Sequence, residues 1–294
     1  MPSHLESDLD LEPQPASSDR ISLKIPGVDA SLTLCLHGQA DQFVSRTLRE
    51  NAIWEPYETE LVVASLKAGD VFLDVGANIG YFTVLAAQLV GQGSKPGKVF
   101  AFEPDAHNCA LLRQSAALNQ LTEVIELSET ALSNEAGEGV LYLSEDNLGD
   151  HQVYASGEVR KQRAITFEHG SHYLGERFSQ LGLAQLDLVK IDTQGSEFQV
   201  VEGLMPLLKG LAVKPRLLIE LTPYSLRAAG ASGRALVALL AQLKLPFWIV
   251  DHIEHELVLT SEAELALWCD NVDSVPNDEG FMNIFVGEAP ERSA

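Results

Sequence analysis

The sequence predicts an α/β fold built on a mostly parallel sheet with helices on both faces. Between residues 71 and 221, short apolar segments rich in β-branched residues alternate with longer segments of helical apolar spacing, and parallel strands require such crossover connections. A glycine-rich turn at residues 76–80 links the first of these strands to the first helix, and a carboxylate, Glu103, ends the second strand. This combination is typical of nucleotide-binding α/β domains.

Length and composition allow one large domain with a small extension. The chain has 294 residues, of which 46% are hydrophobic and 21% charged, enough to bury a full core. We expect a disordered acidic tail at residues 1–20, because it is too polar to offset the entropy cost of ordering. We expect an N-terminal hairpin and helical cap at residues 21–68 and the main domain at residues 69–288.

The charge balance bears on the choice of partners and location. The net charge is -22, with 42 acidic against 20 basic residues, so the surface repels phosphate backbones and anionic lipids. Cys35, Cys109 and Cys269 form no metal-binding or disulfide pattern, and the N-terminus has no features of a signal peptide. We therefore expect no nucleic-acid partner, no membrane partner and a cytoplasmic location.

The segment before the main sheet predicts a small cap. Residues 21–36 alternate apolar and polar side chains around Pro26-Gly27, which predicts a hairpin. Residues 41–48 and 57–66 have helical apolar spacing on either side of Trp54-Glu55-Pro56. These elements would lie beside the glycine-rich turn.

The main domain is predicted element by element from apolar periodicity and turn residues. We expect strands at residues 71–75, 98–102, 124–127, 137–143, 186–191, 216–221, 247–250 and 280–286. We expect helices at residues 81–90, 106–119, 196–208 and 233–243. Residues 144–172 are polar and glycine-containing and predict a long loop, and residues 257–268 predict an insertion between the last two strands.

The turn and the acid after it predict a nucleoside pocket. Gly76 and Gly80 remove side chains where a ligand must approach the backbone, and the following helix directs its N-terminus at the same gap. Glu103 lies at the position from which such folds bind a ribose. Asp74 lies at the strand end, and the third glycine of a dinucleotide-binding turn is missing. Because a carboxylate favours a cationic ligand over a pyrophosphate, these residues favour S-adenosylmethionine over a dinucleotide.

In the order of its motifs, the sequence resembles the FkbM family of S-adenosylmethionine-dependent methyltransferases. The resemblance covers most of residues 54–221. It implies a Rossmann-like class I methyltransferase fold, a seven-stranded sheet with an antiparallel last strand, and methyl transfer to a hydroxyl oxygen of a sugar, polyketide or other secondary metabolite. The segments that carry it are GDVFLDVGANIGYFTVLAA, VFAFEPDAHNCALLRQSAALNQ, TALSNEAGEGVLYLS, LDLVKIDTQGSEFQVVEGL and RLLIELTP.

The resemblance also implies which residues bind the cofactor. It assigns the ribose to Glu103, and it suggests that Glu129 accepts a hydrogen bond from the adenine amine, although an exposed glutamate at a strand end would look the same. It matches Tyr57 and Glu58 to a Tyr-Glu pair that would close the pocket. The residues that match the family's cofactor turn are Asp74, Gly76, Asn78 and Gly80.

Two regions could supply the base for an unactivated hydroxyl acceptor. The first is the end of the fourth core strand, where Asp192 is the preferred candidate and Lys190 and Glu197 would pair with it or hold the loop. The second is the loop containing His151, whose reference pKa of about 6.5 suits a base near neutral pH. This loop would fold over the open face of the cofactor site.

The predicted activity is a metal-independent small-molecule O-methyltransferase. Some O-methyltransferases bind Mg²⁺ through an Asp-Asn pair after the fifth strand, whereas this chain has Glu220-Leu221-Thr222 there. Two alternatives remain open, an NAD-dependent oxidoreductase and a non-catalytic S-adenosylmethionine-binding protein. The expected partner is a small-molecule hydroxyl acceptor, and a homodimer is an open possibility.

Overall fold

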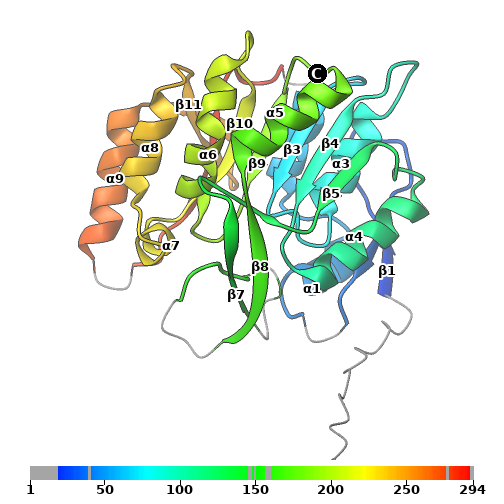
Figure 1. The fold of residues 1–294 in the computed structure, drawn as a ribbon, viewed down its shortest axis with the longest axis horizontal. Helices are drawn as coiled ribbons and strands as arrows, with labels where there is room; N and C mark the ends of the chain where they lie inside the picture. Colours follow the sequence, from blue (N-terminus) through cyan, green and yellow to red (C-terminus); the bar gives the residue numbers. More distant parts are fainter. Residues whose placement is uncertain are drawn as a thin grey trace, which may run out of the picture.

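An eight-stranded sheet forms the centre of the molecule (Figure 1). The computed structural model describes residues 19–38, 41–144, 148, 150–155, 160–275 and 278–291. The spatial order of the strands is β12-β11-β13-β10-β9-β3-β4-β5. In chain order they are β3 (Val71–Val75), β4 (Lys98–Phe102), β5 (Ile125–Ser128), β9 (Leu188–Ile191), β10 (Arg216–Leu221), β11 (Phe247–Asp251), β12 (Glu256–Thr260) and β13 (Met282–Val286).

Strand directions confirm the predicted mostly parallel sheet. Strands β5, β4, β3, β9 and β10 pair in parallel, whereas β13 runs antiparallel to both β10 and β11. The last strand is therefore reversed, as expected. The predicted count of seven is one short, because β12 pairs with β11 from Phe247↔Thr260 to Asp251↔Glu256. Strand β12 lies at the sheet edge with no buried residue, so its sequence lacks the apolar alternation of a core strand.

Helices cover both faces of the sheet, with a separate hydrophobic core on each. Successive residues of β3 alternate between the two, with Phe72 in one core and Val71 and Leu73 in the other. The first core includes α1 (Val44–Asn51), α2 (Pro56–Ser65), α3 (Tyr81–Val90) and α4 (Ala106–Leu118). The second includes α5 (Gly170–Leu181), α6 (Glu197–Gly210), α7 (Pro223–Ala228), α8 (Gly233–Ala241) and α9 (Glu262–Ser274).

The predicted N-terminal hairpin is present and packs on α4. Strands β1 (Asp19–Ser22) and β2 (Thr33–Leu36) pair antiparallel. The side chain of Asn119 accepts a hydrogen bond from the Thr33 N–H at 2.8 Å and donates one to the Thr33 carbonyl at 2.7 Å. The Cys35 N–H donates to the Ser115 hydroxyl at 2.9 Å. These bonds attach the hairpin to the helix that follows Glu103. Residues 1–18 of the predicted tail lie outside the described residues.

A three-stranded sheet extends beyond the main sheet, seen below it in Figure 1. Its strands, in the order β6-β8-β7, are β6 (Ala131–Ser133), β8 (Lys161–His169) and β7 (Gly137–Leu143). The prediction of a long loop over residues 144–172 is therefore wrong for β8 and for the start of α5. Polar residues dominate β8, and only Ile165 is buried, so the segment has no apolar run that would predict a strand.

The structure also bears on the cysteines and on membrane insertion. All three cysteines are unpaired and buried. Within the described ranges, every helix is too short or too polar to cross a bilayer.

Candidate functional site

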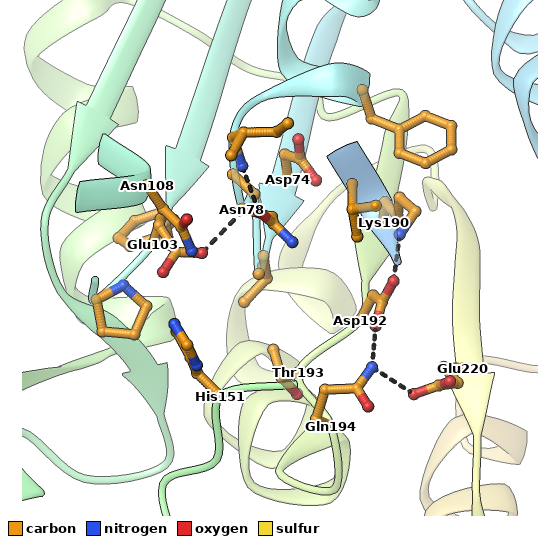
Figure 2. A pocket seen from close by; sticks show the side chains of 18 of the residues that line it. Asp74, Asn78, Glu103, Asn108, His151, Lys190, Asp192, Thr193, Gln194 and Glu220 are labelled. Carbon is orange, nitrogen blue, oxygen red and sulfur yellow. Dashed lines mark hydrogen bonds and ion pairs between the residues drawn. The ribbon is translucent and has the colours of Figure 1, made fainter. Parts of the chain in front are cut away.

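A cavity of about 400 Å³ opens at the C-terminal ends of β3, β4, β9 and β10 (Figure 2). From β3 the strand order runs through β4 to β5 on one side and through β9 to β10 on the other. The cavity therefore lies at the topological switch point, where open α/β sheets bind their ligands. Residues from α1, the segment before α2 and the three-stranded sheet complete its walls.

The turn after β3 depends on its glycines. Gly76 and Gly80 have φ angles of 83° and 91°, and Asn78 has 50°, a region that side chains disfavour. A Cβ atom on Gly76 would lie 1.9 Å from the carbonyl oxygen of Asp192. A Cβ atom on Gly80 would lie 2.5 Å from Cγ of Leu112. The absence of side chains thus lets the turn pack against both the β9 loop and α4.

All five backbone N–H groups of this turn donate to protein atoms. Those of Gly76 and Ala77 donate to the carbonyl of Phe102, and that of Gly80 donates to Ala77. The Asn78 N–H donates to Glu103, and the Ile79 N–H donates to the side chain of Asn78 at 2.6 Å. The turn is therefore internally satisfied and offers no cluster of free donors to a pyrophosphate.

Glu103 is held by backbone donors at the end of β4. One carboxyl oxygen accepts from the Asn78 N–H at 2.8 Å and the other from the Asp105 N–H at 2.8 Å. Only 5% of the residue is exposed, and burial raises its pKa to about 7 against the opposing effect of these N–H groups. A carboxylate has about four acceptor positions. Glu103 therefore keeps acceptor capacity for hydroxyl groups that enter the cavity.

Asn108 and His37 support Glu103, and neither was predicted from the sequence. Asn108, on α4, lines the cavity, and its side chain lowers the pKa of Glu103 by hydrogen bonding. Its Oδ1 lies 2.7 Å from Nε2 of His37, which follows β2. Burial lowers the pKa of His37, so the ring is neutral near pH 7. The contact spans 71 residues of sequence, and no local pattern announces it.

Asp74 lies at the base of the cavity on β3. Its Oδ2 accepts a hydrogen bond from the Thr83 hydroxyl at 2.5 Å, and its register partner on β9 is Lys190. Burial raises the pKa of Asp74 to about 6, partly offset by the charge of Lys190. The structure thus places this predicted cofactor residue between Glu103 and the β9 loop (Figure 2).

A chain of polar side chains crosses the opposite end of the cavity (Figure 2). Lys190 Nζ lies 2.8 Å from Oδ2 of Asp192 and 4.7 Å from the centre of the Phe82 ring. Gln194 donates to Asp192 at 2.9 Å and to Glu220 at 3.2 Å. The chain brings together Asp192 and Lys190, as predicted, and adds Gln194 and Glu220.

Burial and neighbouring charges have opposite effects on the pKa values of Lys190 and Asp192. Burial disfavours the ammonium of Lys190, but Asp192, Glu55 and Asp74 outweigh it and raise its pKa. Burial likewise disfavours ionised Asp192, yet the ammonium and amide donors hold its pKa below the ordinary value. Glu220 has no ammonium of its own, and burial together with neighbouring carboxylates raises its pKa well above the ordinary value. Asp192 is therefore the ionised carboxylate of this end.

Glu197 shapes the β9 loop. Its carboxylate accepts from the Thr193 N–H at 2.9 Å and from the Gly195 N–H at 3.0 Å. Glu197 is fully buried and does not line the cavity. Its contacts are those of the predicted loop-holding residue.

His151 reaches the cavity from the segment between β7 and β8. Its Nδ1 accepts a hydrogen bond from the Ser144 N–H at 3.1 Å, and burial lowers its pKa. The neutral ring must then carry its proton on Nε2. In this arrangement His151 is a hydrogen-bond donor toward ligands, because its lone pair on Nδ1 is already used.

Four predicted cofactor residues do not line the cavity, and one of them, Gly80, packs against Leu112. The carboxylate of Glu129 pairs with Arg113 at 2.8 Å on the surface. Tyr57 stacks on the ring of His255 with 5.2 Å between centroids. Glu58 is buried, accepts from Asn283 and lies 3.2 Å from His252. From the same segment, Trp54 and Glu55 line the cavity instead. Glu58 thus connects α2 to β13 and to the turn after β11, whereas Glu55 faces the cavity.

No group of three or more His, Cys, Asp or Glu side chains suited to a metal ion occurs among the residues with described positions. The donor set of the cavity instead fits an adenosyl sulfonium cofactor. Glu103 offers acceptor capacity for a diol at the end of β4. The carboxyl groups of Asp74 and Asp192 face the same space, which favours a positively charged ligand.

Comparison with known proteins identifies one family. The model of the methyltransferase FkbM domain matches residues 74–244. Methyltransferase sdnD of Sordaria araneosa is 24% identical over 166 residues, 48% of this chain and 62% of that protein. The 31-O-demethyl-FK506 methyltransferase FkbM of Streptomyces tacrolimicus is 29% identical over 163 residues, 47% of this chain and 60% of that protein. The matched part thus spans less than two thirds of either relative.

Solved structures resemble the chain distantly. Precorrin-6y C5,15-methyltransferase from Geobacter metallireducens GS-15 aligns with a TM-score of 0.42 at 12% identity, covering 80% of this chain and 89% of that one. Methyltransferase FkbM from Methylobacillus flagellatus KT aligns with a TM-score of 0.42 at 12% identity, covering 76% of this chain and 47% of that one.

Proposed function

The chain belongs to the FkbM methyltransferase family, and from this premise we propose that it methylates a hydroxyl oxygen of a small molecule. Its cofactor is S-adenosylmethionine, which supplies a methyl group on a positively charged sulfur. One observation carries the proposal. A single cavity holds the diol-binding carboxylate Glu103 at one end and the ionised carboxylate Asp192 at the other. Donor and acceptor sites can therefore share one space.

The alternative of an NAD-dependent oxidoreductase has less support. A dinucleotide site needs backbone N–H groups that are free to hold the pyrophosphate. In this chain the N–H groups of residues 76–80 are used within the protein. Carboxyl groups also face the space beside the turn, where a pyrophosphate would be repelled.

We assign the cofactor-binding roles as follows. Glu103 would accept hydrogen bonds from both ribose hydroxyls, with its geometry fixed by the Asn78 and Asp105 N–H groups. Gly76 would let the turn pack against the backbone of the β9 loop, which sets the position of the turn beside the cofactor. The apolar side chains of Ala131, Leu132 and Leu141 line the cavity and suit an adenine ring.

Asp192 is the proposed base for the acceptor hydroxyl. It is ionised, lies at the cavity wall and is oriented by Lys190 and Gln194. Lys190 would hold this carboxylate in place. His151 would donate a hydrogen bond through Nε2 to the acceptor or cofactor, because its Nδ1 is occupied by Ser144. Alignment of the acceptor oxygen with the methyl group supplies the remaining rate enhancement.

The outer cavity wall supports an acceptor with an apolar framework. Phe43 and Phe281 line the cavity and are 51% and 62% exposed, and Trp54 lies on the same wall. Exposed aromatic side chains at a cavity mouth are typical of binding sites for ring-containing molecules. The relative named for 31-O-demethyl-FK506 is compatible with this class. We therefore propose a polyketide, sugar or other secondary metabolite as acceptor.

Calorimetry with S-adenosylhomocysteine and with NAD tests the cofactor. We expect binding of S-adenosylhomocysteine and no binding of NAD, and the reverse result would contradict the proposal. Transfer of labelled methyl from the cofactor to a panel of polyketides and glycans then tests the reaction. Cofactor binding without transfer to any member of the panel would favour a non-catalytic cofactor-binding protein.

The Asp192→Asn variant tests the proposed base. We expect turnover to fall by about 100-fold or more, with S-adenosylhomocysteine affinity within a few-fold of wild type. Asp270→Asn is the control, because Asp270 pairs with Arg234 on the surface and should leave turnover unchanged. Full activity of Asp192→Asn would remove Asp192 from the reaction.

Three further expectations remain proposals. The unpaired cysteines support a cytoplasmic location. The acidic balance supports the absence of nucleic-acid and membrane partners. The domain boundaries at residues 20 and 68 and the homodimer stay predictions.

A further inference from the structure

The backbone at Glu55 has an unusual conformation. Glu55 is the residue before α2, with φ 40° and ψ 73°, and its side chain makes no capping hydrogen bond. Pro56 follows at the first position of the helix. Residues other than glycine seldom adopt left-handed backbone angles, and when they do they often belong to functional sites. The conformation gives Glu55 no structural benefit as a helix cap.

The Glu55 side chain faces the cavity instead. Within the described part of the chain, no hydrogen bond or close ion pair reaches its carboxyl group. Burial raises the pKa of Glu55 to about 8, although the charge of Lys190 opposes the shift. Glu55 is half-buried at the cavity wall, so its carboxyl group can accept a hydrogen bond from a ligand.

Near Glu55 the cavity is lined by more acidic than basic side chains. Lys190 pairs with Asp192 at 2.8 Å, and its single positive charge is shared among Asp192, Glu55 and Asp74. Glu220 and Asp74 line the same cavity, and each has a raised pKa because of burial. A cationic group entering this end would offset the desolvation of these carboxyl groups.

The strand order separates this acidic end from Glu103. Strand β3 lies between β4, which ends at Glu103, and β9, which leads to Asp192. Figure 2 shows Glu103 and the Lys190–Asp192 pair on opposite sides of Asn78 and Asp74. A ligand that places a diol on Glu103 and extends past β3 therefore meets the acidic end with its other terminus. S-adenosylmethionine has an ammonium group at that terminus.

Resting on the proposed cofactor, we propose that Glu55 binds the ammonium group of its amino-acid portion. The residue would then contribute to affinity for ligands that carry the amino acid. It would contribute nothing to ligands that contain only the adenosine portion. This difference separates a direct contact from a general effect on the fold.

The test compares two ligands in calorimetry. S-adenosylhomocysteine carries the amino acid, whereas 5′-methylthioadenosine lacks it. We expect Glu55→Gln to weaken S-adenosylhomocysteine binding by about tenfold or more, the scale of a hydrogen bond to a charged group. Affinity for 5′-methylthioadenosine should stay within about twofold. Glu60→Gln is the matched control, because Glu60 lies on α2 and is exposed; it should alter neither affinity.

A second variant guards against loss of folding. Glu55→Gly removes the carboxyl group while fitting the left-handed backbone, so we expect normal thermal unfolding and the same selective loss. Unchanged binding of S-adenosylhomocysteine in both variants, or equal weakening of both ligands, would overturn the proposal. If the wild-type protein bound neither ligand, the proposed cofactor itself would be wrong, which is a different result.

Discussion

The two ends of the cavity hold their carboxylates in different ways. Glu103 receives backbone N–H groups from Asn78 and Asp105, which belong to the motifs around β3 and β4. Asp192 is held by the side chains of Lys190 and Gln194. The first arrangement depends on the backbone of the β3 turn and of the segment after β4. The second depends on charged and amide side chains of β9 and the turn that follows it.

This difference predicts how each end responds to substitution. The Glu103 end should be rigid and sensitive to changes of backbone shape. The Asp192 end should be sensitive to charge, because its groups compensate one another in a buried space. Four variants test the contrast, from the largest expected effect to the smallest.

Gly76→Ala should have the largest effect. The new Cβ would lie 1.9 Å from the Asp192 carbonyl oxygen, at a φ of 83°. We expect a loss of at least about 4 kcal/mol in the free energy of unfolding and no measurable S-adenosylhomocysteine binding. Gly175→Ala is the control. It lies within α5 with open space around it, and urea unfolding should show stabilisation of about 0.5–1 kcal/mol. Similar behaviour of the two variants would contradict the packing argument.

Lys190→Met should test the charge balance of the other end. Without the ammonium, the half-buried Asp192 keeps only Gln194 as a side-chain donor, at a cost of about 3 kcal/mol in the free energy of unfolding near pH 7.5. Lys190 holds the pKa of Asp192 low, so the stabilisation by this pair exists at neutral pH and is lost as the carboxylate is protonated in acid. The cost of the variant should therefore shrink at about pH 3, below the ordinary pKa of an aspartate.

Urea unfolding at both pH values checks this result. Lys209→Met is the matched control, because Lys209 is exposed on α6 and its ammonium donates to the side chain of Gln242. It should change stability by less than about 0.5 kcal/mol at either pH. A cost of Lys190→Met that did not depend on pH would argue against the pair.

Glu103→Gln should show the opposite dependence on pH. The folded protein raises the pKa of Glu103 from 4.5 to about 7, so it holds the proton more tightly than the unfolded chain does. Glu103 therefore lowers stability as pH rises from about 5 to 8. Relative to wild type, the variant should gain about 2–3 kcal/mol across this range. Urea unfolding without ligand at several pH values measures the gain, and a flat difference would refute it.

Asn108→Ala should have the smallest effect. The variant removes one hydrogen-bonding neighbour of Glu103 but leaves both backbone donors, so cofactor affinity should fall by about 1 kcal/mol. Asn119→Ala is the control, because Asn119 follows the same helix but bonds to Thr33 of the hairpin. Calorimetry with S-adenosylhomocysteine should find normal affinity for the control. A larger loss for Asn119→Ala would break the contrast.

The sequence predicted the parts of the fold that local patterns determine. The bounds of β3, α3 and β4 agree to the residue, because an apolar run, a glycine turn and helical spacing follow one another there. Strand β8 was missed because its residues are mostly polar, and its extended conformation comes from its pairing with β6 and β7. Helix α7 was missed because it has only six residues.

The residues of the candidate site likewise fall into those that local sequence predicts and those that depend on contacts distant in sequence. The turn residues and Glu103 were predicted from their positions at or after a strand end, and the structure places Asp74, Gly76, Asn78 and Glu103 on the cavity. Glu55, Asn108 and Glu220 were not, because each gains its role from a contact distant in sequence. In the Trp54–Glu58 segment, helical spacing alone could not show that Glu55 lines the cavity while Glu58 contacts Asn283 of β13.

The hairpin and cap have a consequence for exchanging parts among related proteins. The family match begins at residue 74, yet His37 contacts Asn108 and Glu55 lines the cavity. A chimera joined at residue 74 would combine the glycine-rich turn of one protein with the N-terminal hairpin and cap of another, and both parts contribute residues to the same cavity. A chimera designed to keep S-adenosylmethionine binding should therefore take residues 21–68 and the main domain from the same protein.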